Sequence, residues 1–222
     1  MIEVVLDTET TGLSVSNGHR IVEIGCIELE NLIPTKNKFH CYLNPERKVS
    51  EEALKVHGYT DEFLSKQKKF SEVVDQFLEF INGKRLVIHN AEFDIGHLNN
   101  ELSLLGKKKI KEEIVDTVQL ARNKYPGSGS SLDALCKKYN IDNTKREKHN
   151  ALLDCELLSK VYINLLDQKE PKFDLDIEKI NNQKSLDNTT INYHKEVIRP
   201  SNEEIQLHKK FLKSEIKKNY FN

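Results

Sequence analysis

Residues 2–9 read IEVVLDTE, an apolar run that ends in two carboxylates. The apolar part predicts a buried β-strand. Side chains two positions apart on a strand point to the same face, so Asp7 and Glu9 should project together from its end. Two carboxylates placed in this way repel each other unless a cation lies between them, and their oxygens suit hard divalent ions such as Mg2+. Taken alone, the pattern also fits an ordinary strand end that enters a turn.

Two later segments each combine a histidine with an acid. Residues 89–94 read HNAEFD, follow the apolar run at 85–88 and open a helical pattern. Residues 149–154 read HNALLD and begin another helical pattern. The two segments add Asp94, Asp154 and His149 to the acids of the first strand. Each of these side chains, taken alone, could be an ordinary residue at a helix N-terminus.

With these three segments in order, the chain resembles the DEDDh family of 3′→5′ exonucleases over about residues 1–165. The resemblance implies that two divalent ions, Mg2+ or Mn2+, are held by four carboxylates, and that a histidine serves as general base. On this sequence the metal ligands are Asp7, Glu9, Asp94 and Asp154. His149 is then the base, and its position before the start of a helix predicts that it lies on a loop.

The same resemblance implies a pocket for the terminal nucleotides of a single-stranded 3′ end of DNA. Its expected residues share a place beside the three acidic segments, and they are Thr10, Leu13, Val56, His57, Asn90, Phe93 and Ala151. Hydroxyl and amide groups can bond sugar or phosphate, and apolar side chains can stack on bases irrespective of sequence. Plain core packing remains an alternative for Leu13 and Val56.

The hydrophobic periodicity predicts an α/β domain. Strands are expected first, and strands alternating with helices follow, which is typical of a mixed sheet covered by helices. The expected strands are 2–6, 19–30, 38–43, 85–89 and 114–117. The expected helices are a short one that begins at 50 and ends in 56–58, and those at 70–81, 91–105, 118–123, 132–139 and 151–166. The family resemblance implies a ribonuclease-H-like fold, with a mixed five-stranded sheet flanked by helices and the catalytic strand at its centre.

The composition and the charge of the chain limit where the protein is expected in the cell and how it can bind DNA. The formal net charge is −1, which does not favour a protein that coats long duplex DNA. None of the four cysteines forms a Cys-x-x-Cys pair, no signal peptide is visible at Met1, and no apolar run approaches the ~20 residues needed to cross a bilayer. We therefore expect a cytoplasmic protein with no membrane contact.

The amino-acid composition of the chain changes near residue 167. We predict an exonuclease domain over 1–167, a flexible linker over 168–198 and a helical tail over 199–222, with a cap at Ser201 or Asn202. The tail resembles the polymerase-docking helix of the epsilon-subunit family of bacterial DNA polymerase III. Residues 168–173 have the glutamine and aromatic ends of a sliding-clamp-binding peptide, but Pro171 stands where that peptide usually has Leu or Met. A clamp contact and an ordinary linker both remain open.

These features predict a 3′→5′ exodeoxyribonuclease that removes mispaired terminal nucleotides as the proofreading subunit of a replicative polymerase. Two alternatives remain at this stage. One is a stand-alone nuclease that trims RNA or DNA 3′ ends. The other is a catalytically silent adaptor between polymerase and clamp, which the complete acidic set argues against, because clustered carboxylates without a metal destabilise the fold.

Overall fold

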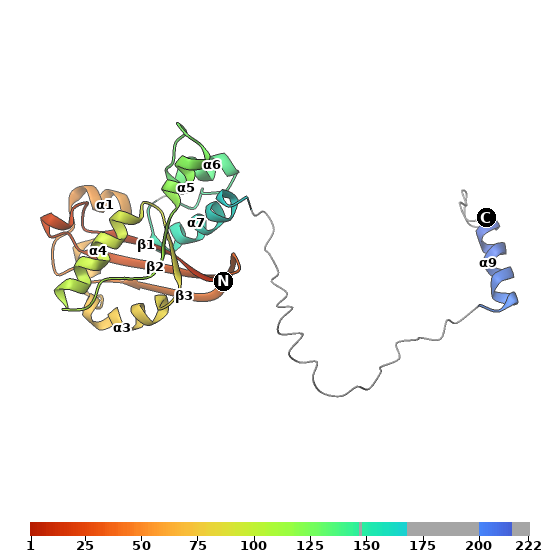
Figure 1. Cartoon of the computed structure of the whole chain (residues 1–222), viewed down its shortest axis with the longest axis horizontal. Coiled ribbons are helices and arrows are strands. Elements are labelled where there is room, and N and C mark those ends of the chain that lie inside the picture. The colour runs from red at the N-terminus through yellow and green to blue at the C-terminus, as the bar shows by residue number, and fades with distance from the viewer. Residues whose placement is uncertain (147, 168–199, 215–222) are drawn as a thin grey trace, which may run out of the picture. The chain divides into compact units, whose positions relative to one another are not determined.

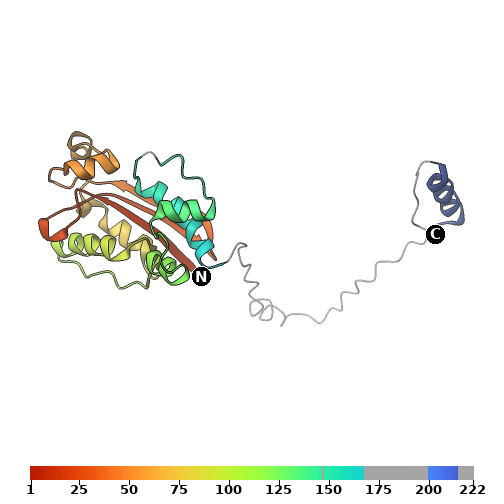
Figure 2. The ribbon, with the colours of Figure 1, turned by 90° about the horizontal axis from the view of Figure 1, so that it is seen from above.

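The computed structural model describes residues 1–146, 148–167 and 200–214. A sheet with helices on both faces forms the first part of the chain (Figures 1 and 2). The strands are β1 (Ile2–Thr10), β2 (Ile21–Glu30), β3 (Ile33–Tyr42), β4 (Arg85–Ile88) and β5 (Ile114–Asp116). The helices around them are η1 (Val15–Asn17), α1 (Glu51–His57), α2 (Asp61–Ser65), α3 (Phe70–Ile81), α4 (Ala91–Leu104), α5 (Thr117–Lys124), α6 (Leu132–Tyr139) and α7 (Ala151–Leu165).

The sheet has five strands in the order β3-β2-β1-β4-β5, so β1 is central as predicted. Strand β1 pairs antiparallel with β2 and parallel with β4, and β5 extends the parallel part. Because β1 and β4 are parallel, their carboxyl ends lie at the same edge. The first acidic segment and the segment at 89–94 therefore meet there.

Alternation along β1 divides the core into two layers. Val4 and Leu6 pack with α3 and α4 on one face of the sheet. Val5 packs with α5, α6 and α7 on the other face. Asp7 and Glu9 continue the odd positions and so face α7, whereas Thr8 faces α4. One strand end thus presents polar groups to helices on both sides.

Helix α7 lies close against β2 because Gly25 has no side chain. A Cβ atom at this position would come within 2.5 Å of the Ala151 carbonyl carbon. The thiol of Cys155 also donates a hydrogen bond to the Gly25 carbonyl oxygen at 3.2 Å. This contact fixes the first turn of α7 next to the sheet, at the height of the acidic strand end.

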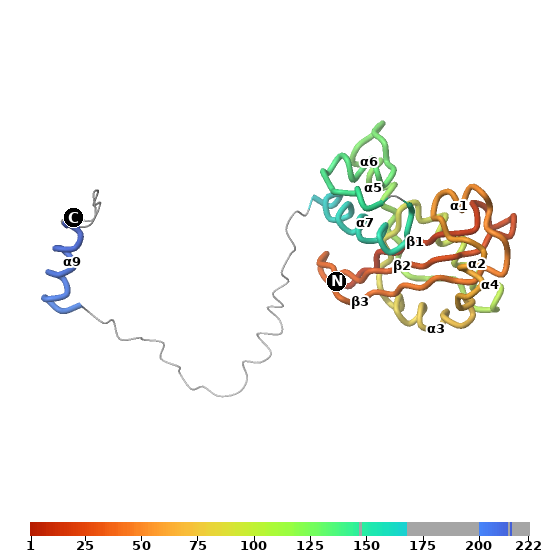
Figure 3. The backbone as a smooth tube through the Cα atoms, turned by 180° about the vertical axis from the view of Figure 1, so that it is seen from behind, coloured from red at the N-terminus to blue at the C-terminus, as the bar shows by residue number. Residues whose placement is uncertain are grey.

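The predicted elements are confirmed, with differences at the ends. Strand β3 begins at Ile33, earlier than predicted, because Pro34 and the polar residues after it obscure its alternation. Helix α1 is capped by Ser50 and ends at His57, before Gly58, as predicted. The short helix α2 was not predicted, since its five residues are too few for a periodic signal; Thr60 caps it by accepting from Phe63 N. Figure 3 shows α1 and α2 at the end of the sheet away from the N-terminus.

The tail contains one described helix, α9 (Asn202–Ser214). Ser201 caps it: the Ser201 hydroxyl accepts from Glu204 N at 3.2 Å, and Ser201 N donates to the Glu204 carboxylate at 2.8 Å. The apolar side chains of Leu207 and Phe211 are exposed. The predicted linker and the segment 168–173 lie outside the described residues, as does the rest of the tail. None of the helices in the described part of the chain has the length and apolar character to span a bilayer.

Candidate active site

The acidic and histidine side chains predicted from the three segments meet in one cavity. Asp7 and Glu9 come from the end of β1, Asp94 from the first turn of α4, and Asp154 from the first turn of α7. His149 comes just before Asn150, the N-cap of α7. The cavity measures about 260 Å³ and is lined by Asp7, Thr8, Glu9, His89, Asn90, Phe93, Asp94, Leu132, Arg146, His149, Asp154 and Leu158.

Asp94 is held in place by Thr8. The backbone N–H and the hydroxyl of Thr8 both donate to Oδ1 of Asp94, at 2.9 and 2.7 Å. Asn90 starts the helix with a left-handed backbone, φ +66°, a conformation that asparagine tolerates better than most residues. The turn from β4 into α4 thereby brings Asp94 to the side of β1.

Burial and mutual repulsion raise the pKa of three carboxyl groups. The pKa of Asp7 is well above its ordinary value because the group is buried and lies near Asp94, Glu9 and Asp154. Burial, followed by Asp154, raises the pKa of Glu9 to about 8, and burial raises that of Asp94 to about 7. The protein thus concentrates acids whose ionised state a bound cation would favour.

His149 stands beside two of these acids. Its Nδ1 lies 3.9 Å from Glu9 Oε1 and 3.6 Å from Asp154 Oδ2. Its backbone N–H donates to the carbonyl of Val56 at 3.1 Å, which ties the loop before α7 to the end of α1. Ligand atoms of Glu9, His149 and Asp154 all lie within 4.8 Å of one another, a spacing that one metal ion could bridge. Partial burial, and then the nearby Arg146, lower the pKa of the imidazole.

Arg146 is a site residue that sequence reasoning missed. It donates to both oxygens of Asp154, at 2.5 and 2.7 Å, and to Asp133 at 2.9 Å. A third contact runs from its guanidinium to His149 Nδ1, at 3.1 Å. Arg146 belongs to the polar stretch 143–148, whose composition predicts a solvent-exposed loop. Only its distance of eight residues from Asp154, with a turn between, could have pointed to this pairing.

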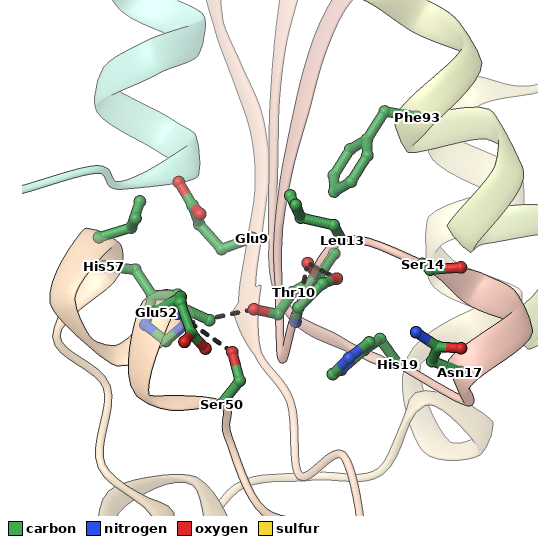
Figure 4. A pocket seen from close by; sticks show the side chains of 13 residues that line it. Glu9, Thr10, Leu13, Ser14, Asn17, His19, Ser50, Glu52, His57 and Phe93 are labelled. Atoms are coloured by element: carbon green, nitrogen blue, oxygen red, sulfur yellow. Dashed lines mark hydrogen bonds between the residues drawn. The ribbon is translucent and has the colours of Figure 1, made fainter.

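A larger cavity of about 530 Å³ adjoins the acidic one, and Glu9 and Phe93 line both. Five predicted substrate residues line it, namely Thr10, Leu13, Val56, His57 and Phe93. Leu13 is 85% exposed and lies next to the Phe93 ring, as Figure 4 shows. Gly12 lies nearby, and a Cβ there would come within 2.4 Å of the His19 ring, so any other residue would displace that side chain. The cavity has the apolar walls and the size that suit a nucleotide base.

Some predicted polar groups of this pocket already bond the protein. The Thr10 hydroxyl donates to the Gly12 carbonyl at 2.8 Å. His57 donates through Nε2 to the Thr10 carbonyl and accepts at Nδ1 from Tyr59 N. The ring of His57 can therefore form a wall, while its nitrogens hold the turn. Asn90 lines the smaller, acidic cavity.

Ala151 lines neither of the two cavities. It is fully buried in the first turn of α7, where it packs on Gly25. Its backbone N–H donates to the buried carboxylate of Glu23 on β2, at 3.0 Å. Glu23 was also missed, although a charged residue between the apolar Val22 and Ile24 is an informative signal in a strand.

Comparisons with known proteins identify the family of the chain. A family model described as Exonuclease matches residues 4–162. The DNA polymerase III subunit epsilon of Rickettsia felis is 45% identical to this chain and covers 97% of both chains. The chain belongs to the exonuclease family of the polymerase III epsilon subunits. The subunit epsilon of Escherichia coli is 48% identical over 72% of this chain and 70% of its own length.

Solved structures agree on the fold. The nuclease domain of 3′hExo, described as a DEDDh family member bound to rAMP, superposes with a TM-score of 0.66. It covers 76% of this chain and 92% of its own, at 19% sequence identity. The ribonuclease-H-like prediction is therefore confirmed, and the chain is a metal-dependent 3′→5′ exonuclease of this family.

Proposed function

We propose that this exonuclease removes mispaired nucleotides from the 3′ end of a single DNA strand, as the proofreading subunit of a replicative polymerase. One observation carries the chemistry: four carboxylates and an imidazole from three separate segments share a cavity that adjoins a larger, partly apolar one. Because the two cavities adjoin, a terminal base bound in the larger one would place its phosphate beside the carboxylates. The names of its relatives support DNA and the polymerase as partners.

The residues present fit divalent metal ions. Their donors are carboxylate oxygens, which hard ions such as Mg2+ or Mn2+ prefer. Burial first raises the pKa values of Asp7, Glu9 and Asp94, and neighbouring negative charge adds to the rise at Asp7 and Glu9, so a bound cation would offset both effects. We propose that Asp7 would help to hold both ions, with Glu9 and Asp154 as further ligands of one and Asp94 of the other. When bound, the ions would activate a water molecule and stabilise charge on the phosphate.

The side chains of this chain would supply the remaining steps. His149, whose lowered pKa keeps it neutral near pH 7, would accept the proton of the attacking water. Leu13 and Phe93 would hold the terminal base between them in the larger cavity. Val56 would form the wall of the larger cavity on the side of α1. Thr8 keeps Asp94 in a fixed orientation during these steps.

We propose the domain boundaries of the sequence analysis for the whole chain: exonuclease 1–167, linker 168–198 and polymerase-binding tail 199–222. The exposed Leu207 and Phe211 of the capped helix α9 support a docking role for the tail, since an isolated helix of 13 residues is marginal in water without a surface to pack on. A clamp contact through 168–173 stays a prediction, and so does the cytoplasmic location, which follows from a role in replication.

The test is hydrolysis of 5′-labelled primers with a matched or a mismatched 3′ terminus, in Mg2+, in Mn2+ and in EDTA. We expect stepwise shortening with release of nucleoside 5′-monophosphates, faster at the mismatched end, and none in EDTA. Addition of the polymerase subunit should increase excision on the primer–template. Equal rates on RNA with no effect of the polymerase would favour a trimming nuclease. Polymerase binding without hydrolysis would favour an adaptor.

A further inference from the structure

The buried residue Glu23 joins several segments around the active site. It is fully buried on β2 and pairs across the sheet with Glu9 of β1. Its Oε1 accepts from His40 Nε2 at 2.7 Å and from the Asn150 side-chain amide at 2.7 Å. Its Oε2 accepts from the Tyr59 hydroxyl at 2.8 Å and from Ala151 N at 3.0 Å. Four donors thus surround one carboxylate.

This arrangement suits a carboxylate and no other side chain of the same size. A carboxylate accepts through both oxygens, whereas a glutamine amide would turn two of its own donors toward these partners. Ala151 N belongs to the first residue of α7, where backbone N–H groups have no partner within the helix and favour negative charge. A buried carboxylate is costly unless it is bonded in this manner.

Two of the four donors lead directly to the active site. Asn150 caps α7 by accepting from Leu153 N at 3.0 Å, and it follows His149 in the chain. Tyr59 stacks on the His57 ring at 4.8 Å, and His57 lines the larger cavity. Glu23 therefore links the N-cap of α7, which directly follows His149, to the end of α1, which lines the larger cavity.

We propose that Glu23 is a positioning residue that sets the placement of His149 through Asn150 and Ala151. This inference rests on the proposed role of His149 as general base. Substitution by glutamine should loosen Asn150 and, with it, the adjacent His149, while the contacts of Gly25 still hold the first turn of α7 on the sheet. A displacement of about 1 Å at a reacting group can cost about 10²-fold in rate, so we expect kcat to fall about 10- to 100-fold.

The test uses the full chain and single-turnover excision at a temperature where each variant is folded. Glu23→Gln is compared with Glu28→Gln, a matched control on the same strand, since Glu28 is also buried and accepts from Lys84, Thr35 and Asn37. A second variant, Asn150→Asp, keeps a good helix cap but removes the donor to Glu23. It keeps the inference testable if Glu23→Gln does not fold.

A double-mutant cycle separates positioning from general stability. In a His149→Gln background, Glu23→Gln or Asn150→Asp should cost much less than in the wild type, because the base it positions is gone. Glu28→Gln should retain wild-type kcat. Equal losses in both backgrounds, or wild-type kcat in both site variants, would overturn the inference. Absence of hydrolysis by the wild type would instead refute the proposed function.

Discussion

Arg146 binds Asp154 and His149 with one guanidinium group: it donates to both oxygens of the carboxylate and to Nδ1 of the imidazole. Because arginine only donates, Nδ1 is an acceptor in this arrangement, and a neutral ring carries its proton on Nε2. A metal ion would compete with this guanidinium for the oxygens of Asp154, and a reactive proton would compete with it for the lone pair of Nδ1. We therefore expect the guanidinium to shift when His149 accepts a proton at Nδ1.

The first prediction follows from this competition. Arg146→Gln should increase the affinity of the protein for Mn2+, measured by titration calorimetry, because it removes a cation that occupies Asp154. Without metal the variant should unfold more easily, by about 3 kcal/mol, since both partners of this pair are largely buried. Lys145→Gln removes an adjacent exposed positive charge and is the matched control. Weaker Mn2+ binding in Arg146→Gln would mean that the arginine supports the metal site.

The second prediction concerns Asp7. Asp7→Asn should lower the excision rate on the order of 10³-fold, because it removes a ligand whose metal contacts supply several kcal/mol. The same change should raise the melting temperature in EDTA, since Asp94, Glu9 and Asp154 then lose one repelling neighbour. Thermal unfolding and excision assays on one preparation measure both effects. Near-normal turnover in Mg2+ would refute the metal assignment.

The third prediction concerns the pH dependence of turnover. His149 must be neutral to accept a proton, and burial together with Arg146 places its pKa below the ordinary value of 6.5. The rate should therefore rise with pH along a limb below that value and then level off. His149→Gln should lose about 10²–10⁴-fold in rate and flatten the limb. A limb that persists unchanged in the variant would identify another base.

The fourth prediction concerns stability without metal. Folding raises the pKa of Glu9 from 4.5 to about 8 and that of Asp94 from 3.8 to about 7. Between these values the folded protein holds protons that the unfolded chain releases, so their contribution to stability is lost as pH rises. Urea unfolding in EDTA should show a steady decrease from pH 5 to 8. Saturating Mg2+ should reduce this decrease in the free energy of unfolding. Glu9→Gln should also reduce it, in EDTA. A free energy of unfolding that does not change with pH would contradict the raised pKa values.

The fifth prediction concerns the tail. Phe211→Asp should weaken binding to the polymerase subunit by about 10-fold or more, because it places a charge where an exposed apolar ring would be buried. Adding Ile205→Asp should increase the loss. Gln206→Asp introduces the same charge at another exposed position of α9 and should bind normally. Excision from single strands should remain unchanged in all three, and a loss there would assign the helix to the exonuclease itself.

The sequence predicted the elements with strong periodicity, and it predicted the acids because each follows a strand or begins a helix. Asp7, Glu9, Asp94 and Asp154 could be assigned to one site from the sequence because their three segments resemble the motifs of one family. The side chains that bind these acids could not be predicted from the sequence. The Arg146–Asp154 pair depends on the path of a polar loop, which leaves no period in the sequence.

Long-range hydrogen bonds were also beyond prediction. Glu23 and Asn150 are 127 residues apart in the chain. Their contact depends on how closely α7 approaches the sheet, which in turn depends on Gly25. A single glycine in a strand indicates a close backbone approach but does not name the partner. The sequence alone could therefore suggest that something lay against β2, without identifying the start of α7.

The alternation along β1 has a consequence for tolerance to mutation. Asp7 and Glu9 face one layer of helices and Thr8 faces the other, so the chemistry depends on the same two-residue repeat that builds the core. A one-residue insertion or deletion before Asp7 would turn the acids toward α4 and Thr8 toward α7. Such a variant could recover its apolar packing by sliding the strand and still be inactive. Loops can change in length, whereas this strand cannot.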